Sequence, residues 1–278
     1  MSALREAVAR GRKLRSISRV VDVSINTVDR YLIPAGEACA AFHDRTVRGV
    51  TSKRVQCDEI WSFCAMKEKT AKAKGHDRPE GAGDAWTWTG IDADTKLIIA
   101  WLVGDRDAGC AHEFMMDVAS RLANRIQLTT DGHGAYLSAV ESAFGRGWGI
   151  DYAQLVKIYG ETPESEVRYS PAKCIGARKD HISTSYIERS NLTLRMANRR
   201  YTRLTNAFSR KLENHGHMVA LYTVWYNFVK MHRTLKMTPA LAANVSTTLW
   251  SIDDLVALVD KHDAAKPRQK PGRKPEAK

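Results

Sequence analysis

The alternation of apolar and polar positions between residues 54 and 159 predicts strands and helices in mixed order. Runs rich in β-branched and aromatic residues predict five strands, over residues 54–63, 86–91, 96–103, 126–130 and 152–159. The first three are separated by polar and turn-forming stretches and are expected to form an antiparallel meander. Apolar residues at helical spacing predict helices over 108–123 and 135–144. This order indicates an α/β domain built on a five-stranded sheet.

Helices are also predicted ahead of this domain. Residues 16–22 and 25–33 read as two short helices joined by a tight turn, with Ser24 placed to cap the second. The pair fits a helix-turn-helix that binds DNA, although an ordinary helical hairpin has the same pattern. Pro34-Ala35-Gly36 is predicted to end this unit, and residues 37–52 to form a helical or irregular connector.

A further helix is predicted to begin near residue 184. Ser183, Thr184 and Ser185 can each cap it, and the sequence does not decide among them. Ile187 and Leu194, seven residues apart, can anchor one side of this helix to a core. Another side gathers residues three and four apart, namely Glu188, Asn191, Arg195 and Arg199.

The other segments are predicted from composition. Residues 65–84 and 160–183 read as long loops, the first of them mobile and basic. A long apolar helix is expected over residues 211–232. Shorter helices are expected from Thr238 and over 252–259, and the Pro- and Lys-rich tail is expected to be disordered.

Composition and charge limit the classes of partner that the protein is expected to bind. The 278 residues carry a formal charge of +12 with 44% hydrophobic residues, which favours a globular protein that binds a polyanion. There is no signal peptide and no apolar run of about 18 residues, so a membrane role is not expected. The five cysteines include no Cys-x-x-Cys pair, which argues against a disulfide framework and a zinc module. We expect a cytoplasmic protein that associates with the nucleoid when it binds DNA.

The basic residues are concentrated in blocks. Residues 188–212 hold seven Lys or Arg against Glu188 alone, and residues 1–33 hold seven against three acids. Such blocks are often only solvated faces, but several in one chain favour a shared polyanion. The second N-terminal helix would present short polar and basic side chains near its start, where recognition helices read DNA: Ser24, Asn26, Thr27 and Arg30.

Three carboxylates stand at positions that the predicted fold can bring together. Asp58 lies within the first strand, Asp131 ends the fourth, and Glu188 lies on the helix that follows the fifth. If the fourth strand pairs in parallel beside the first, the two aspartates are neighbours, and a helix packed across the sheet brings Glu188 to them. Adjacent carboxylates repel one another, and divalent cations with oxygen ligands remove that cost.

Each of these acids also has an ordinary explanation. An aspartate in a strand is often satisfied by hydrogen bonds within the fold and has no further role. Asp131-Gly132 is often a turn, and a helical glutamate is usually solvated. Asp92 and Asp94 are explained by a hairpin turn. His133 either contacts phosphate or caps a helix. His215 and His217 are expected at the surface. The order of the three acids on suitable elements, with basic flanks, favours a shared site.

The chain resembles the DDE transposases of bacterial insertion sequences, within the RNase H-like and retroviral-integrase superfamily. The similarity runs from about Val55 to Trp250. It is carried by Asp58-Glu59-Ile60-Trp61, Thr130-Asp131-Gly132-His133, Ile187-Glu188-Arg189-Ser190-Asn191, Arg195, and the stretches Tyr226-Asn227-Phe228, His232-Arg233-Thr234-Leu235 and Thr238-Pro239-Ala240.

The resemblance implies an RNase H-like mixed five-stranded sheet flanked by helices, with an N-terminal helix-turn-helix and a C-terminal helical extension. The expected organisation is a DNA-binding domain at 1–36, a connector at 37–52, a catalytic domain at 53–198, a helical region at 199–260 and a basic disordered tail at 261–278.

The implied activity is cleavage of element ends and transfer of the 3′-hydroxyl to target DNA. Asp58, Asp131 and Glu188 would ligate Mg²⁺ or Mn²⁺, expected as two ions about 3.5–4 Å apart, and Arg195 would lie near DNA. The implied partners are double-stranded DNA and further copies of the chain, as a homodimer or larger assembly. A non-catalytic DNA-binding regulator and a nuclease acting on RNA–DNA hybrids are the alternatives.

Overall fold

The computed structural model describes residues 17–19, 22–145, 150–155, 157–158, 168–169, 173–175, 182–202 and 207–266. The predictions for residues 1–16 and for the tail from residue 267 therefore lie outside the described residues. No helix in the described part is long and apolar enough to cross a membrane.

The five predicted strands lie in one six-stranded sheet with the order β3-β2-β1-β4-β5-β8. The five expected strands are β1 (Arg54–Cys64), β2 (Gly83–Asp92), β3 (Ile98–Gly104), β4 (Ile126–Asp131) and β5 (Ile150–Leu155). β1, β2 and β3 form the predicted antiparallel meander, and β4 runs parallel to both β1 and β5. The five-strand order 3-2-1-4-5 with flanking helices is RNase H-like.

Short strands replace part of the loop predicted at 160–183. β8 (Lys173–Ile175) pairs antiparallel with β5 and adds a sixth strand. β7 (Arg168–Tyr169) pairs in a separate sheet with β6 (Lys157–Ile158), which was predicted as part of the fifth strand. Strands of two or three residues form by backbone pairing at an edge and are too short to show an apolar period.

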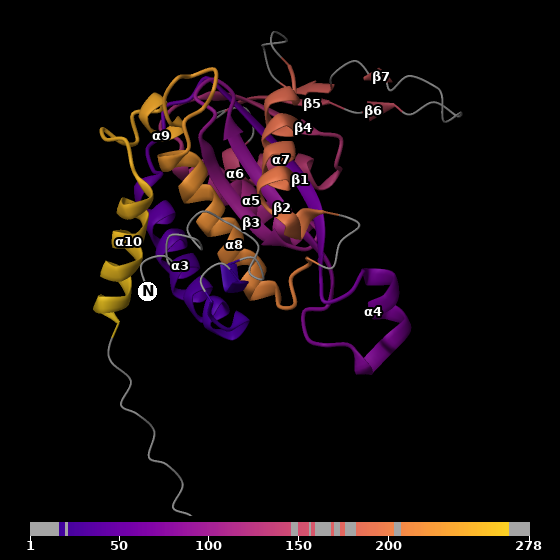
Figure 1. Cartoon of the computed structure of the whole chain (residues 1–278). Coiled ribbons are helices and arrows are strands. Elements are labelled where there is room, and N and C mark those ends of the chain that lie inside the picture. Colours follow the sequence, from indigo (N-terminus) through magenta and orange to yellow (C-terminus); the bar gives the residue numbers. More distant parts are fainter. Residues whose placement is uncertain are drawn as a thin grey trace, which may run out of the picture.

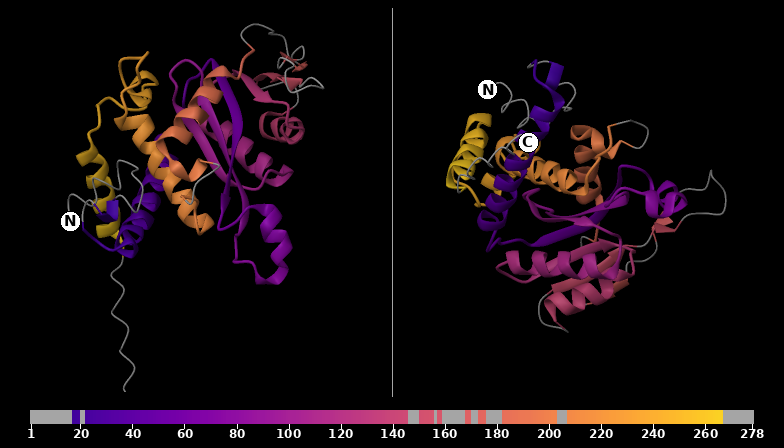
Figure 2. Two further views of the ribbon diagram at one scale, coloured as in Figure 1. Left: turned by 45° about the vertical axis from the view of Figure 1, so that its right-hand side comes forward. Right: turned by 90° about the horizontal axis from the view of Figure 1, so that it is seen from below.

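Helices cover both faces of the sheet (Figure 1). On one face lie α5 (Ala108–Arg121) and α6 (Ala135–Phe144), and on the other lie α7 (Ser185–Ala197) and α8 (Leu212–Val224), as the view from below makes clear (Figure 2). Of two more helices, α3 (Ile25–Thr46) packs on α8, and α10 (Ile252–Ala265) packs on α3. The sheet is therefore the middle of three layers.

Successive side chains of β1 point alternately to the two helical layers on either side of the sheet. Cys57 lies against the α5 side, since its Sγ is 3.2 Å from where a Cβ on Gly90 would stand, next to Phe114. Ile60 packs on the other face in a cluster with Leu194 of α7. Odd-numbered positions thus face α5 and α6, and even-numbered positions face α7 and α8.

The first described long helix differs from its prediction. α3 runs without interruption from Ile25 to Thr46 with Pro34 inside it, so the expected end at Pro34–Gly36 is wrong. Residues 37–46, expected to be helical or irregular, continue the same helix. A proline removes one backbone hydrogen bond, but packing on α8 and α10 stabilises the helix. A Cβ on Gly36 would lie 2.3 Å from the His217 Cβ, so Gly36 permits the close crossing of α3 and α8.

The start of α3 agrees with the prediction. Ser24 caps it, and the Ser24 hydroxyl accepts a hydrogen bond from the Thr27 backbone N–H at 3.2 Å. Residues 17–19 are helical. The remainder of the predicted first helix includes residues outside the described part, so the helix-turn-helix stays a prediction.

Three other segments contain helices that can be compared with the predictions. The segment expected to be a mobile basic loop contains α4 (Glu68–Lys74) and the 3-10 turn η1 (Gly75–Asp77). The single helix predicted at 211–232 is α8 followed by a π-helix, η3 (Trp225–Val229). As expected, Thr238 caps a short helix, α9 (Pro239–Ala242).

Candidate metal centre

Strand pairing places two of the predicted acids side by side. The parallel register of β1 with β4 ends at Cys57 opposite Thr130, so the next residues on the two strands are Asp58 and Asp131. The prediction that parallel pairing makes these aspartates neighbours is confirmed. They stand at the carboxyl end of β4, the edge where open α/β sheets hold their ligand sites.

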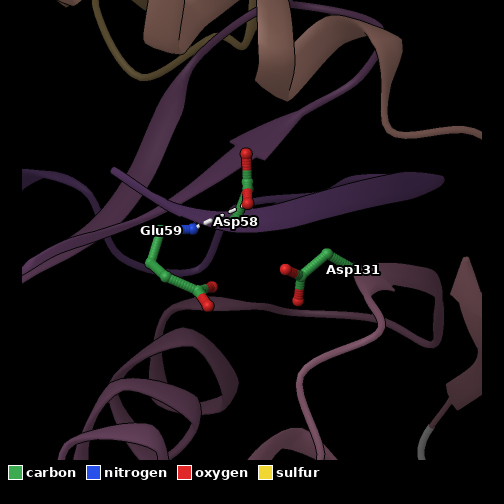
Figure 3. Close-up of side chains that lie close together, drawn as sticks. All are labelled: Asp58, Glu59 and Asp131. Carbon is green, nitrogen blue, oxygen red and sulfur yellow. Dashed lines mark hydrogen bonds between the residues drawn. The ribbon is translucent and has the colours of Figure 1, made fainter. Parts of the chain in front are cut away.

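A third carboxylate joins them that the sequence did not identify. Ligand oxygens of Asp58, Glu59 and Asp131 all lie within 4.8 Å of one another (Figure 3). Asp58 and Glu59 are consecutive, and their side chains leave β1 toward opposite faces of the sheet. Glu59 reaches Asp131 because β4 ends at Asp131, and the alternation along β1 does not indicate this contact.

Glu59 is held by two donors on the α6 side. Arg106 Nε donates to Glu59 Oε1 at 2.6 Å, and the Tyr136 hydroxyl donates to Glu59 Oε2 at 3.0 Å. Arg106 Nη2 also lies 3.6 Å from Asp131 Oδ2. One guanidinium is therefore shared by two of the three carboxylates. Arg106 follows β3 in a polar turn, and no sequence pattern connects it with the site.

Asp58 is oriented by donors on both of its oxygens. The Glu59 backbone N–H donates to Asp58 Oδ1 at 2.9 Å, and Asn191 Nδ2 donates to Asp58 Oδ2 at 2.9 Å. Thr89 Oγ1 donates to Asn191 Oδ1 at 3.1 Å, which fixes the orientation of the amide. Asn191, which was expected to contact DNA, has a buried side chain in this structure, and its amide bonds Asp58 and Thr89.

The electrostatics of the cluster favour protonation. Burial, followed by the nearby charges of Asp131 and Glu59, raises the pKa of Asp58 to about 7. Burial and the charge of Asp131 also raise the pKa of Glu59, although Arg106 and Tyr136 oppose that shift. The carboxylates are thus crowded beyond what their local donors compensate.

Helix α7 is docked on β1 through its first turn. Gln56 Oε1 accepts hydrogen bonds from the backbone N–H groups of Tyr186 and Ile187, both at 3.0 Å. Of the three candidate caps, Thr184 occupies the cap position, but its side chain makes no capping bond. Ile187 and Leu194 are buried, as predicted.

Glu188 lies on this docked helix, one turn before Asn191. The Thr184 hydroxyl donates to Glu188 Oε1 at 2.9 Å. Glu188 is not among the residues whose ligand oxygens lie within 4.8 Å of one another. The fold therefore brings Asp58 and Asp131 together and carries Glu188 on the neighbouring helix, with its carboxylate turned to Thr184.

The remaining predicted contacts lie outside this cluster. Arg195 is exposed on α7, but α7 ends at Ala197 and Arg199 begins the separate 3-10 turn η2 (Arg199–Tyr201), so Arg199 does not extend the helical face. Asn26 and Arg30 are exposed on α3, whereas the Ser24 and Thr27 hydroxyls lie 2.9 Å apart and bond to each other.

Two histidine predictions have different outcomes. The His133 backbone N–H donates to Asp131 Oδ1 at 3.0 Å, so this residue supports the aspartate through its main chain. The surface assignment of His215 is wrong: it is fully buried, Ser209 Oγ lies 2.8 Å from its Nδ1, and burial lowers its pKa to about 3. Polar partners from β1 and η2 make this burial tolerable, and a helical spacing rule does not detect them.

The donor set suits a divalent cation. All three residues offer carboxylate oxygens, the ligands that Mg²⁺ and Mn²⁺ take. The ligand oxygens lie within 4.8 Å of one another, and oxygens on opposite sides of one Mg²⁺ ion would be about 4.2 Å apart. A cation would also offset the repulsion that raises the pKa of Asp58.

Comparison with known proteins adds little to this geometry. No protein-family model matches the sequence, and no curated protein matches it. Similar solved structures include the Mos1 strand transfer complex, at 12% identity over 93% of this chain and 75% of that chain, with a TM-score of 0.34. A pre-cleavage Mos1 transpososome matches at 10% identity over 93% and 76% of the two chains, with a TM-score of 0.33. The RNase H-like classification therefore rests on the strand order itself.

Proposed function

We propose that this protein is a DDE transposase of the bacterial insertion-sequence type, which cleaves the ends of a mobile element and joins them to target DNA. The observation that carries the proposal is the pairing of Asp58 with Asp131 at adjoining strand positions of an RNase H-like sheet, beneath a helix that carries Glu188. The charge of +12 supports a nucleic-acid substrate.

Asp58, Asp131 and Glu188 are the proposed ligands of Mg²⁺ or Mn²⁺, with Glu59 beside them. When bound, a pair of such ions supplies activation of the attacking oxygen and stabilisation of the leaving oxygen. To ligate an ion, Glu188 would have to give up the hydrogen bond that its Oε1 accepts from Thr184.

The chain's other residues orient this centre. Asn191 and the Glu59 N–H hold both oxygens of Asp58, so that its carboxylate keeps one orientation. Arg106 balances the charge of Glu59 and Asp131. No side chain serves as the nucleophile in this scheme, and no covalent bond to DNA is required.

Recognition of the element ends is assigned to the N-terminal region, with Asn26 and Arg30 exposed at the start of α3. Phosphate contacts by Arg195 and Arg199 are proposed at the catalytic face. Joining two ends requires at least two catalytic domains, so the proposed active form is a dimer or larger assembly on DNA.

The test is strand transfer with Mn²⁺ on duplexes that carry the inverted repeats flanking the gene. Asp58→Asn, Asp131→Asn and Glu188→Gln are each expected to abolish cleavage and joining while duplex binding persists. Asp151→Asn, on the neighbouring strand β5 but away from the cluster, is the matched control and should remain active. Full activity in the first three variants contradicts the mechanism. Specific duplex binding without cleavage in the unaltered protein favours a non-catalytic regulator instead.

A further inference from the structure

A cationic loop follows the π-helix η3. Residues 230–237 include Lys230, Arg233 and Lys236 together with His232, and they contain no acid. Arg233 and Lys236 are exposed, as are the apolar side chains of Met231 and Met237, at 50% and 42%. A surface that combines bare cations with exposed methionines is costly to leave without a partner.

The loop is built as a fixed structure. The His232 N–H donates to the Met237 carbonyl, and the Lys236 N–H donates to the His232 carbonyl, both at 2.9 Å. The preceding π-helix is tied to β3 by buried Asn227, whose side chain accepts from the Ile98 N–H and donates to the Ile98 carbonyl, both at 2.9 Å. Short π-helices often occur at functional sites, and this one fixes where the loop leaves the core.

Two cations from other elements lie beside the loop. Burial, followed by the nearby charge of Arg189 on α7, lowers the pKa of Lys230. Burial, followed by the charges of Lys230 and of Lys96 in the β2–β3 turn, lowers the pKa of His232. Lys96 Nζ lies 3.2 Å from the centre of the Tyr186 ring at the start of α7. The surface formed by residues 230–237, Lys96 and Arg189 is called the cationic surface below.

Several of its charges have no carboxylate partner. Within the described part of the chain, neither Arg189 nor the Lys and Arg residues of the loop have a carboxylate oxygen within 4.0 Å. Lys230 Nζ instead lies 5.4 Å from the centres of the Trp225 and Tyr226 rings. Aromatic faces hold an ammonium group in place without cancelling its charge, which leaves that charge available to an external anion.

We propose that the cationic surface binds the phosphate backbone of a DNA strand next to Glu188. The choice of DNA rests on the function proposed above. The position supports it, because Arg189 directly follows Glu188 and Tyr186 lies on the turn before it. Several cations from three chain segments fit a repeating polyanion better than a single acidic side chain.

The location of the strand is tested by photocrosslinking in the full-length protein. p-Benzoylphenylalanine replaces either Met231 or Leu249, which are exposed to similar extents of 50% and 56%. A labelled duplex with a single-stranded end is expected to crosslink several-fold more at position 231 than at position 249. Equal crosslinking at the two positions overturns the proposal.

The charge contacts are tested by the salt dependence of binding. The double variant Lys230→Gln/Arg233→Gln is expected to bind DNA more weakly, with the slope of log K against log salt reduced by about 1.8 for a duplex or about 1.4 for a single strand. The control double variant Lys53→Gln/Lys261→Gln removes two exposed lysines elsewhere and should leave the slope unchanged. Equal slopes for the two double variants overturn the proposal.

Failure of this inference is distinguishable from failure of the proposed function. Crosslinking at position 231 in a protein that never performs strand transfer supports the surface and contradicts the transposase. Normal strand transfer with unaltered binding by Lys230→Gln/Arg233→Gln contradicts the surface alone.

Discussion

Acidic residues are paired with arginines at one end of the central strands and crowded together at the other. At the amino-terminal end of β1 and β4, Arg54 pairs with Asp94, and Arg125 Nη2 lies 2.7 Å from Asp151 Oδ1. At the other end three carboxylates lie together, and two of them, Glu59 and Asp131, share the guanidinium of Arg106. Acids matched one to one stabilise the fold, whereas crowded acids weaken it, which points to a role in binding a cation.

The largest contrast expected is in stability. Asp92 is 1% exposed and accepts hydrogen bonds from Ser52 Oγ at 3.0 Å, the Asp94 N–H at 3.0 Å and Thr95 Oγ1 at 2.6 Å. Asp92→Ala should lower the free energy of unfolding by about 3 kcal/mol, because it leaves these buried donors without an acceptor. Asp58→Asn should lower it little or raise it, because it relieves repulsion. Urea denaturation measures both, and equal losses would remove the distinction between the two ends.

A divalent cation should stabilise only one of the two ends. At a Mn²⁺ concentration about a hundredfold above Kd, the free energy of unfolding should rise by about 2.7 kcal/mol. Asp131→Asn should abolish this gain, and Asp151→Asn should retain it. Thermal unfolding with Mn²⁺ and with a chelator gives the comparison. A gain that survives in Asp131→Asn shows that the ion binds elsewhere.

The pH dependence of stability should carry the signature of Asp58. Its pKa is raised from 3.8 to about 7, so the folded chain binds this proton more tightly than the unfolded chain does. Its contribution to stability is therefore complete below about pH 4 and lost as pH rises through about 7, by up to about 1.4 kcal/mol per pH unit. Unfolding in chelator between these limits should show a shallower decline for Asp58→Asn, and identical profiles would contradict the crowding.

A smaller effect is expected from the residue that orients Asp58. Asn191→Leu removes the donor to Asp58 Oδ2 and should weaken Mn²⁺ binding by about tenfold, the lower end for partners of metal ligands. Thr193→Val, also on α7, removes a hydroxyl that bonds only within the helix and should bind the ion normally. Titration calorimetry distinguishes them, and an unchanged affinity in Asn191→Leu excludes the positioning role.

The smallest effect belongs to the matched pairs. The side chains of Arg54 and Asp94 are 30% and 39% exposed. Solvent screens such a pair, so Arg54→Gln should cost about 0.5 kcal/mol of unfolding free energy. A loss several times larger would mean that this end depends on its ion pairs more than their exposure allows. Chemical denaturation of Arg54→Gln beside the unaltered chain provides the measurement.

The sequence predicted the sheet well because its strands are long enough to show their period, and Asp58 meets Asp131 because parallel pairing leaves them adjacent. Glu59 was missed because a strand period assigns it to the face opposite Asp58, and only the end of β4 removes that barrier. Arg106 was missed because its contact depends on the direction in which the chain leaves β3.

Local signals misled where packing overrides propensity. Pro34 and Gly36 indicate a helix end, yet α3 continues because α8 and α10 support it. Asn191 shares a helical face with Glu188, but the spacing could not show that this face is turned to β1. In each case the missing information was a contact between elements distant in the sequence.

The two attachments of α7 to β1 have a geometric consequence. Gln56 and Asp58 are two strand residues apart, or about 6.6 Å, while the points they bind, near Ile187 and at Asn191, are four helical residues apart, or about 6 Å. Because these two spacings are nearly equal, both hydrogen-bonded attachments form at the same time and set the position of the helix along the strand. A helix inserted one residue out of step would satisfy one attachment and forfeit the other. Glu188 lies in the sequence between the two attachment points on α7, so the spacing of these attachments sets its position over the sheet.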